Sequence, residues 1–196
     1  MADYAFLIGR SDATPVYSAG DRDEEIVYAC DWIPIAWLAF FEPADVTGVA
    51  WPPESEPDVQ DGDEWPQCCA ILRSRESALV LYARRKDRLK RVFPPYMAPL
   101  FDALERAVQG ASSGFIQVVL SDLDVYLSFF EEMSEHLRDD IAVMDSEDVG
   151  GWSGLMPAVQ AEMLGAFGKV HFKGRLDIPA AVGYLPDEYA IDVSSR

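Results

Sequence analysis

Histidine, cysteine and asparagine are scarce in this chain, and each scarcity excludes a class of site. Asparagine does not occur at all, so no Asn-x-Ser/Thr glycosylation acceptor exists. The two histidines, His136 and His171, have no further histidine or cysteine at the spacing of a zinc site. The three cysteines form an odd set, and the adjacent pair Cys68 and Cys69 does not follow zinc spacing either. We expect reduced, partly buried thiols and no metal or other cofactor.

Long apolar runs are missing as well. Residues 1–9 lack the cationic start and the apolar core of a secretory signal. No stretch elsewhere approaches the roughly 20 apolar residues that span a bilayer. We therefore expect a cytoplasmic protein without a membrane partner.

Basic residues are few and unevenly placed. The 196 residues include 34 Asp and Glu against 16 Lys and Arg, a formal charge of −18. Residues 73–91 form a basic segment of net charge +6 between two acidic regions. The overall charge repels polyanions, which argues against nucleic acid as a partner. The basic segment either balances acidic groups inside the molecule or meets an acidic patch on a partner.

Composition and periodicity predict one α+β domain over residues 1–196, with several helices packed on a small sheet. The hydrophobic content of 49% is enough for a core despite the charge. Short runs of β-branched and aromatic residues bounded by turn residues predict strands. We expect them at Tyr4–Ile8, Glu25–Cys30, Cys69–Leu72 and Phe115–Leu120.

Helical spacing of apolar residues, with proline and glycine at the ends, predicts the helices. The first, Ile33–Phe41, is almost entirely apolar and is expected to be buried, with Trp37 and Phe40 in the core. A basic amphipathic helix is expected from about Ser77. The remaining expected helices are Met97–Gln109, a long helix from Ser121 to about Met144 with an apolar stripe and an anionic face, and Ser153–Phe167.

Catalytic signatures are absent or incomplete. The stretch Gly151–Leu155 resembles a nucleophile elbow around Ser153, but leucine stands where the final glycine is required. No glycine-rich phosphate loop is present. We expect a protein that is not an enzyme. Two alternatives stay open: a small hydrolase-like enzyme using His136 or His171, and a non-catalytic homodimeric scaffold.

Two short stretches and the overall layout carry a family resemblance. The opening residues Met1–Gly9, the helix Ile33–Phe41 with its Ile-Pro-Ile-Ala-Trp-Leu sequence, and the acidic single domain resemble bacterial immunity proteins encoded beside polymorphic or contact-dependent toxins. The resemblance implies a cytoplasmic protein that binds a cognate, basic toxin domain and blocks it. It carries over no active residue, and the oligomeric state stays open.

Two acidic segments are the expected contact surface for such a partner: the acidic loop Glu54–Glu64 and the acidic helix face Glu131–Asp148. An anionic surface speeds the encounter with a cationic protein, and tight binding adds aromatic anchors. The predicted partner-binding residues are Glu54, Glu56, Asp58, Asp61, Asp63, Glu64, Trp65, Glu131, Glu132, Glu135, Asp139, Asp140, Asp145, Glu147, Asp148 and Trp152.

Overall fold

A five-stranded antiparallel sheet forms the centre of the molecule. The computed structural model describes residues 4–30, 33–50, 67–93, 95–120, 130–145 and 182–189. The strand order is β2-β1-β5-β4-β3, and every neighbouring pair runs antiparallel. The strands are β1 Tyr4–Arg10, β2 Glu24–Cys30, β3 Val46–Ala50, β4 Gln67–Ser74 and β5 Phe115–Val119.

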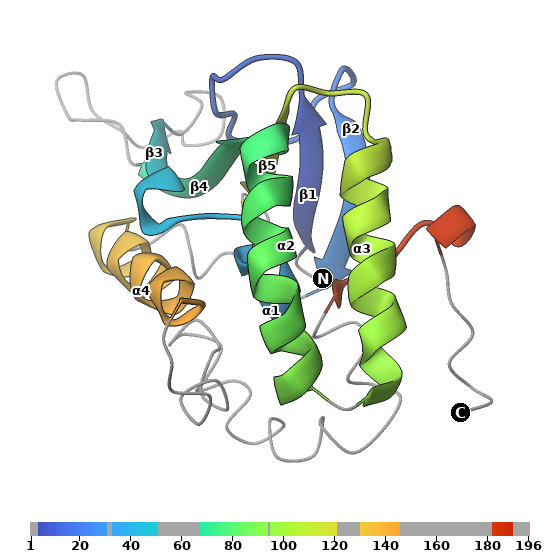
Figure 1. Cartoon of the computed structure of the whole chain (residues 1–196). Coiled ribbons are helices and arrows are strands. Elements are labelled where there is room, and N and C mark those ends of the chain that lie inside the picture. The colour runs from blue at the N-terminus through green and yellow to red at the C-terminus, as the bar shows by residue number, and fades with distance from the viewer. Residues whose placement is uncertain are drawn as a thin grey trace, which may run out of the picture.

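Helices cover one face of this sheet and one of its ends. Helices α2 and α3 lie side by side across the front of the sheet, and α4 lies beyond its β3–β4 side (Figure 1). The helices are α1 Ile35–Leu38, α2 Arg75–Val92, α3 Ala98–Gly110 and α4 Phe130–Val143, with the 3-10 turns η1 Pro43–Asp45, η3 Pro95–Met97 and η6 Asp187–Tyr189. The α+β fold expected from the sequence, with several helices on a small sheet, is confirmed.

The four predicted strands are all present. Strands β1, β2 and β4 extend beyond their predicted bounds by one or more residues, whereas β5 ends one residue earlier than predicted. Strand β3 is not predicted by alternation, because glycine stands at its centre and it has only five residues. It pairs along its full length with β4, from Val46 opposite Ile71 to Ala50 opposite Gln67. A long-range pairing thus creates a strand that local propensity does not indicate.

Helix α1 is shorter than the predicted Ile33–Phe41. Pro34 has φ −59° and ψ 134°, so its backbone is extended and the helix begins after it. The expectation of burial is confirmed, because Trp37 and Phe40 are both 0% exposed. The Phe40 ring stacks on Tyr82 of α2, with ring centroids 4.0 Å apart. This contact fixes α1 beneath α2 in the main core.

Helix α2 begins where Ser74 caps it, since the Ser74 hydroxyl accepts a hydrogen bond from the Ser77 amide at 3.4 Å. Its buried positions recur every three or four residues and face the sheet and α3. They are Ala78, Leu81, Tyr82, Arg85 and Leu89. An arginine therefore occupies a core position in the middle of the basic segment.

Residues 182–189, which we call the C-terminal strap, close the outer edge of β2. The Tyr184 amide donates to the Tyr28 carbonyl at 2.7 Å, which makes an isolated antiparallel bridge. The Trp37 indole donates to the Val182 carbonyl at 3.0 Å in the interior. Between them Gly183 has φ 78°, and an added Cβ would lie 2.8 Å from Trp37 and from the Tyr28 carbonyl oxygen. Only glycine allows this close approach.

Candidate interaction surface

Helix α4 presents carboxylates on its outer face. Its sequence contains five acidic residues against one arginine. The buried positions Ser134, Leu137, Ile141 and Met144 lie at spacings of three and four residues and face η1, β3 and β4. On the opposite side the side chains of three acids are exposed. We call them the acidic face of α4: Glu131, Glu135 and Asp139.

These three carboxylates are not neutralised by the rest of the described structure. No ion pair or hydrogen bond joins the carboxylates of the acidic face to another side chain in the described part of the chain. Glu132 belongs to the same helix, but the placement of its side chain lies outside the described residues. The acidic face therefore projects charge into solvent.

Asp140 differs from its neighbours. It is half-buried, and burial is the main cause that raises its pKa to about 7, with His136 lowering it and Asp139 raising it. One of its carboxylate oxygens, Oδ2, is buried without a hydrogen-bond partner in the described structure. Near neutral pH this side chain is partly protonated, so it adds less negative charge than the sequence indicates.

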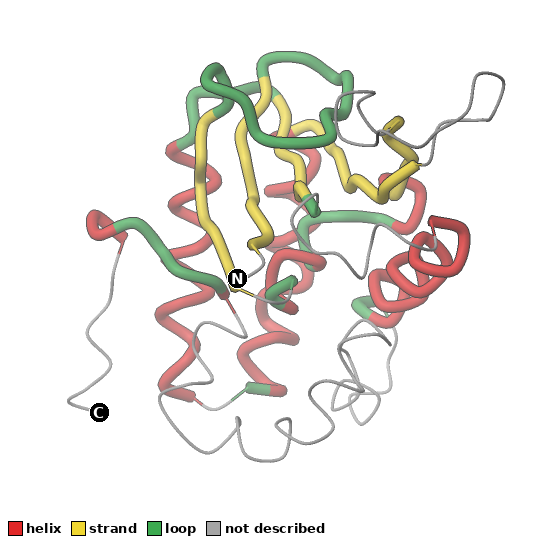
Figure 2. Tube along the Cα trace, turned by 180° about the vertical axis from the view of Figure 1, so that it is seen from behind, coloured by secondary structure: helices red, strands yellow, loops and turns green. Residues whose placement is uncertain are grey.

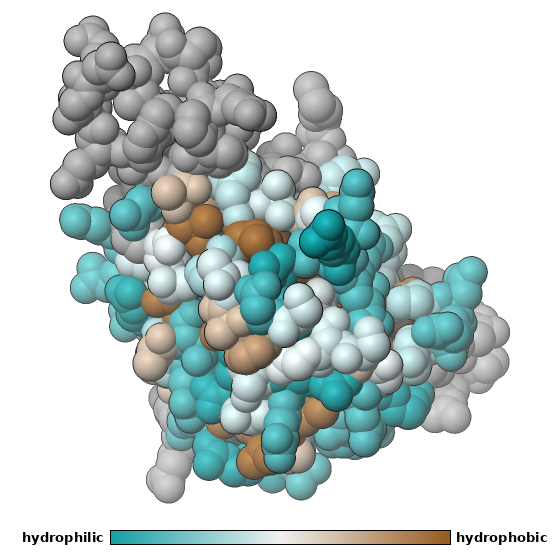
Figure 3. Space-filling model, turned by 90° about the horizontal axis from the view of Figure 1, so that it is seen from above, coloured by the Kyte–Doolittle hydropathy of each residue, from teal (hydrophilic) through white to brown (hydrophobic). Residues whose placement is uncertain are grey.

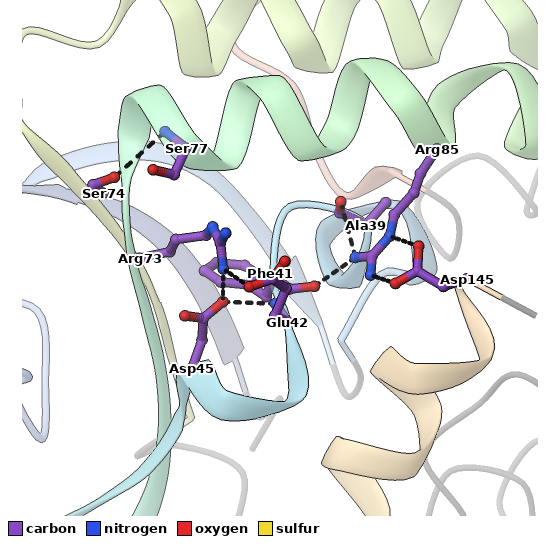
Figure 4. Close-up of polar contacts among 9 residues, drawn as sticks. All are labelled: Ala39, Phe41, Glu42, Asp45, Arg73, Ser74, Ser77, Arg85 and Asp145. Atoms are coloured by element: carbon purple, nitrogen blue, oxygen red, sulfur yellow. Dashed lines mark hydrogen bonds and ion pairs between the residues drawn. The ribbon is translucent and has the colours of Figure 1, made fainter.

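Asp145 anchors the end of α4. The Arg85 guanidinium donates to both of its carboxylate oxygens, with Nε 2.9 Å from Oδ1 (Figure 4). Arg85 is 2% exposed and also donates to the Ala39 and Phe41 carbonyls. The hydrogen bonds from Arg85 are the largest cause of the lowered pKa of Asp145. This predicted binding residue is therefore already held within the chain.

Three further cations of α2, Lys86, Arg88 and Lys90, also contact groups of the same chain. The Lys86 ammonium lies 2.9 Å from Asp102 and 2.5 Å from Glu105, both on α3. Lys90 reaches Asp102 at 2.8 Å. Burial opposes ionisation of Asp102, but hydrogen bonds from Lys90 and Lys86 outweigh it and lower the pKa. Arg88 donates to the Met144 carbonyl at the end of α4, at 2.8 Å.

Arg73 of β4 and Arg10 of β1 are also paired with carboxylates of the same chain. Arg73 lies 2.9 Å from Glu42 and 2.7 Å from Asp45 of η1, as Figure 4 shows. Arg10 lies 2.6 Å from Asp23. Of the two interpretations of the basic segment, internal balance accounts for Arg73, Arg85, Lys86 and Lys90.

The other predicted partner-binding residues are not among those that the structure describes. Ten members of the predicted set, together with His171, lie outside the described residues. They are Glu54, Glu56, Asp58, Asp61, Asp63, Glu64, Trp65, Glu147, Asp148 and Trp152. The described part of the predicted surface is therefore the acidic face of α4 with Asp140 and Asp145.

The thiols do not have the environment of catalytic nucleophiles. Cys68 and Cys69 of β4 are free and buried, as expected for both. Burial raises the pKa of Cys68 to about 11 and that of Cys69 to about 12. At neutral pH both are protonated and poor nucleophiles. Among the described residues, no group of three or more His, Cys, Asp or Glu side chains is placed to hold a metal ion.

Exposed large apolar side chains are sparse in the described structure. Val80 on α2 is 63% exposed and Tyr184 in the C-terminal strap is 42% exposed. The end of the molecule seen in Figure 3 is mostly hydrophilic, with hydrophobic residues in small separate patches. None of the described helices has the length and apolar character needed to cross a membrane.

Sequence reasoning missed one surface feature, a row of half-exposed aromatic rings. Tyr4 and Phe6 of β1 alternate with the core residues Ala5 and Leu7, so they point away from α2 and α3. Tyr28 stands opposite Phe6 on β2, and Tyr184 stacks on Tyr28 with ring centroids 5.0 Å apart. We call Tyr4, Phe6, Tyr28 and Tyr184 the aromatic stripe. The alternation Tyr-Ala-Phe-Leu was the signal available in the sequence.

The chain matches no protein-family model, and no curated protein and no solved structure is significantly similar to it.

Proposed function

We propose that this chain is a cytoplasmic immunity-type protein that binds a cationic toxin domain through the acidic face of α4 and thereby inhibits it. The observation that carries the proposal is that cations of α2 are ion-paired within the chain whereas carboxylates of α4 face solvent. Arg85, Lys86 and Lys90 of α2 are ion-paired inside the molecule, whereas Glu131, Glu135 and Asp139 of α4 have no such partners in the described structure.

The electrostatics of such a surface favour a cationic protein. A net charge of −18 attracts a basic partner over long range, and it raises the association rate most at low ionic strength. The same charge disfavours nucleic acid and anionic lipid, because neither would neutralise the carboxylates. Charge complementarity thus supports both the class of partner and discrimination against other classes.

The seating of α4 also suits a binding surface. Its inner face packs on β3 and β4, and its C-terminal end is held by Arg85 and Arg88 of α2. A helix fixed in this way loses little conformational entropy on binding. The carboxylates are therefore presented on a rigid element.

The proposal is tested with the toxin domain encoded in the neighbouring reading frame. The variant Glu131→Lys/Glu135→Lys/Asp139→Lys reverses the acidic face, and we expect it to weaken binding by at least about ten-fold. The matched control Asp12→Lys/Glu76→Lys/Asp87→Lys makes the same change in charge at exposed positions on other elements. Calorimetry measures both affinities, and equal loss in the two variants would contradict a docking role for α4.

A further inference from the structure

The aromatic stripe is assembled from three segments that are far apart in sequence. The rings of Tyr4 and Phe6 lie 6.1 Å apart, those of Tyr4 and Tyr28 lie 6.2 Å apart, and Tyr184 stacks on Tyr28 at an interplanar angle of 17°. The stripe crosses β1 and β2 on the sheet face that Figure 2 turns toward the viewer, with α2 and α3 behind the strands. These rings are partly accessible to solvent.

The position of Tyr184 is fixed by the interior of the protein. Its amide is bonded to the Tyr28 carbonyl, and the preceding Gly183 and Val182 pack against Trp37 in the core. The stacked pair is therefore ordered before any partner arrives. A rigid aromatic surface binds with a low entropic cost, which is why tyrosine is common in binding sites.

Among the described residues within four positions of Tyr28 or Tyr184, the charged side chains are all acidic. Glu25, Asp187 and Glu188 are exposed and lie within four residues of Tyr28 or Tyr184 along the chain. Neither β2 nor the strap contains a basic residue, and Arg10 at the far end of β1 is paired with Asp23. Aromatic faces attract cations, and flanking carboxylates add to that attraction.

We infer that the aromatic stripe is a docking surface for arginine side chains of a cationic protein partner. Arginine is the occupant because its planar guanidinium stacks on tyrosine while donating hydrogen bonds to the flanking carboxylates. A second copy of this chain would bring another charge of −18, and a nucleic acid would bring phosphates, so both are repelled. The inference rests on the cationic partner of the proposed function and adds a second contact surface to it.

The test uses the full chain and two peptides of equal length, poly-arginine and poly-lysine. We expect the unaltered protein to bind poly-arginine more tightly, since cation–π attraction and stacking favour arginine. Tyr184→Leu keeps the apolar bulk and removes the ring, and we expect it to lower the affinity for poly-arginine about three- to five-fold. Tyr184→Phe keeps the ring and should bind like the unaltered protein.

Phe6→Leu is a second variant at a different position in the stripe, with the same expected loss. Val80→Ala is the control, because Val80 is 63% exposed on α2, on the other side of the sheet. Thermal unfolding of each variant checks that the fold is retained. Equal affinity for the two peptides, or unchanged poly-arginine binding in both leucine variants, would overturn the inference.

The reversal of the acidic face of α4 separates this inference from the proposed function. If that reversal weakens both peptides and the toxin domain while Tyr184→Leu changes nothing, the stripe is not a contact surface and the α4 proposal stands. If Tyr184→Leu weakens poly-arginine binding and the reversal has no effect on any ligand, the stripe stands and the α4 proposal fails.

Discussion

Helices α2 and α4 carry charges of opposite sign, and the molecule uses them in opposite ways. Along α2 three of the cations reach carboxylates of the same chain: Arg85 reaches Asp145, and Lys86 and Lys90 reach carboxylates of α3. Along α4 the acids at Glu131 and Glu135 turn toward solvent. A run of charge in a sequence therefore does not define a surface until burial and partners are known. Among the described residues, the exposed acids of α4 face solvent without ion-pair partners, whereas α2 exposes only part of its basic charge, at Arg84 and Arg91.

The largest effect should follow from replacing Arg85, the buried cation of α2. Arg85→Met removes a guanidinium that is 2% exposed and leaves Asp145 and the carbonyls of Ala39 and Phe41 without their donor. We expect a loss of about 3 kcal/mol in the free energy of unfolding, measured with urea. Arg91→Met alters an exposed arginine of the same helix and should cost less than about 0.5 kcal/mol. Similar losses in both variants would show that Arg85 has no special structural role.

The raised pKa of Asp140 on α4 predicts a stability that depends on pH. Its pKa of about 7 lies above the ordinary value of 3.8, so the folded state retains a proton that the unfolded state releases. The contribution of this group to stability is fully present below about pH 4 and is lost as the pH rises through about 7. We expect Asp140→Asn to stabilise the protein at pH 8 by about 1 to 2 kcal/mol, with the gain shrinking toward pH 4.

The matched control is Glu135→Gln, an exposed acid of the same helix that is not among the groups acting on Asp140, for which we expect a smaller effect on stability than for Asp140→Asn at pH 8. Thermal unfolding across this pH range measures both variants. A stability difference for Asp140→Asn that does not vary with pH would contradict the raised pKa. Asp145 and Asp102 act in the opposite direction, because the pKa of each is lowered in the folded state. Each therefore stabilises the folded state above its ordinary pKa, and this contribution is lost as the pH falls through the lowered pKa.

The smallest effect concerns the partly exposed pairs between α2 and α3. Lys90→Met removes the ion pair with Asp102 at 2.8 Å but keeps the aliphatic stem. Because solvent screens this pair, we expect a loss of only about 0.5 kcal/mol, and less at high salt. Urea unfolding at low and high ionic strength checks this. A loss as large as that of Arg85→Met would mean that burial does not determine how much each cation contributes to the free energy of unfolding.

Much of the fold could be predicted from local patterns, because four strands are short apolar runs rich in β-branched and aromatic residues and the long helices have clear apolar spacing. Strand β3 and the true limits of α1 depend on tertiary pairing and on the backbone of Pro34, which periodicity does not register. The acidic face of α4 was likewise visible as a pattern. The capture of Asp145 by Arg85 was not, because these residues are separated by 60 positions and only the packing of α4 on the molecule brings them together.

The most direct test of the contrast between α2 and α4 is the association rate constant with the proposed partner, a cationic toxin domain, at about 50 mM and about 500 mM salt. For the unaltered protein we expect fast association that slows strongly as salt rises. For Glu131→Lys/Glu135→Lys/Asp139→Lys we expect slow association with much weaker salt dependence, while Asp12→Lys/Glu76→Lys/Asp87→Lys stays closer to the unaltered protein. Identical rates for the two triple variants at low salt would contradict a docking surface on α4 and would leave the carboxylates a general role in solubility.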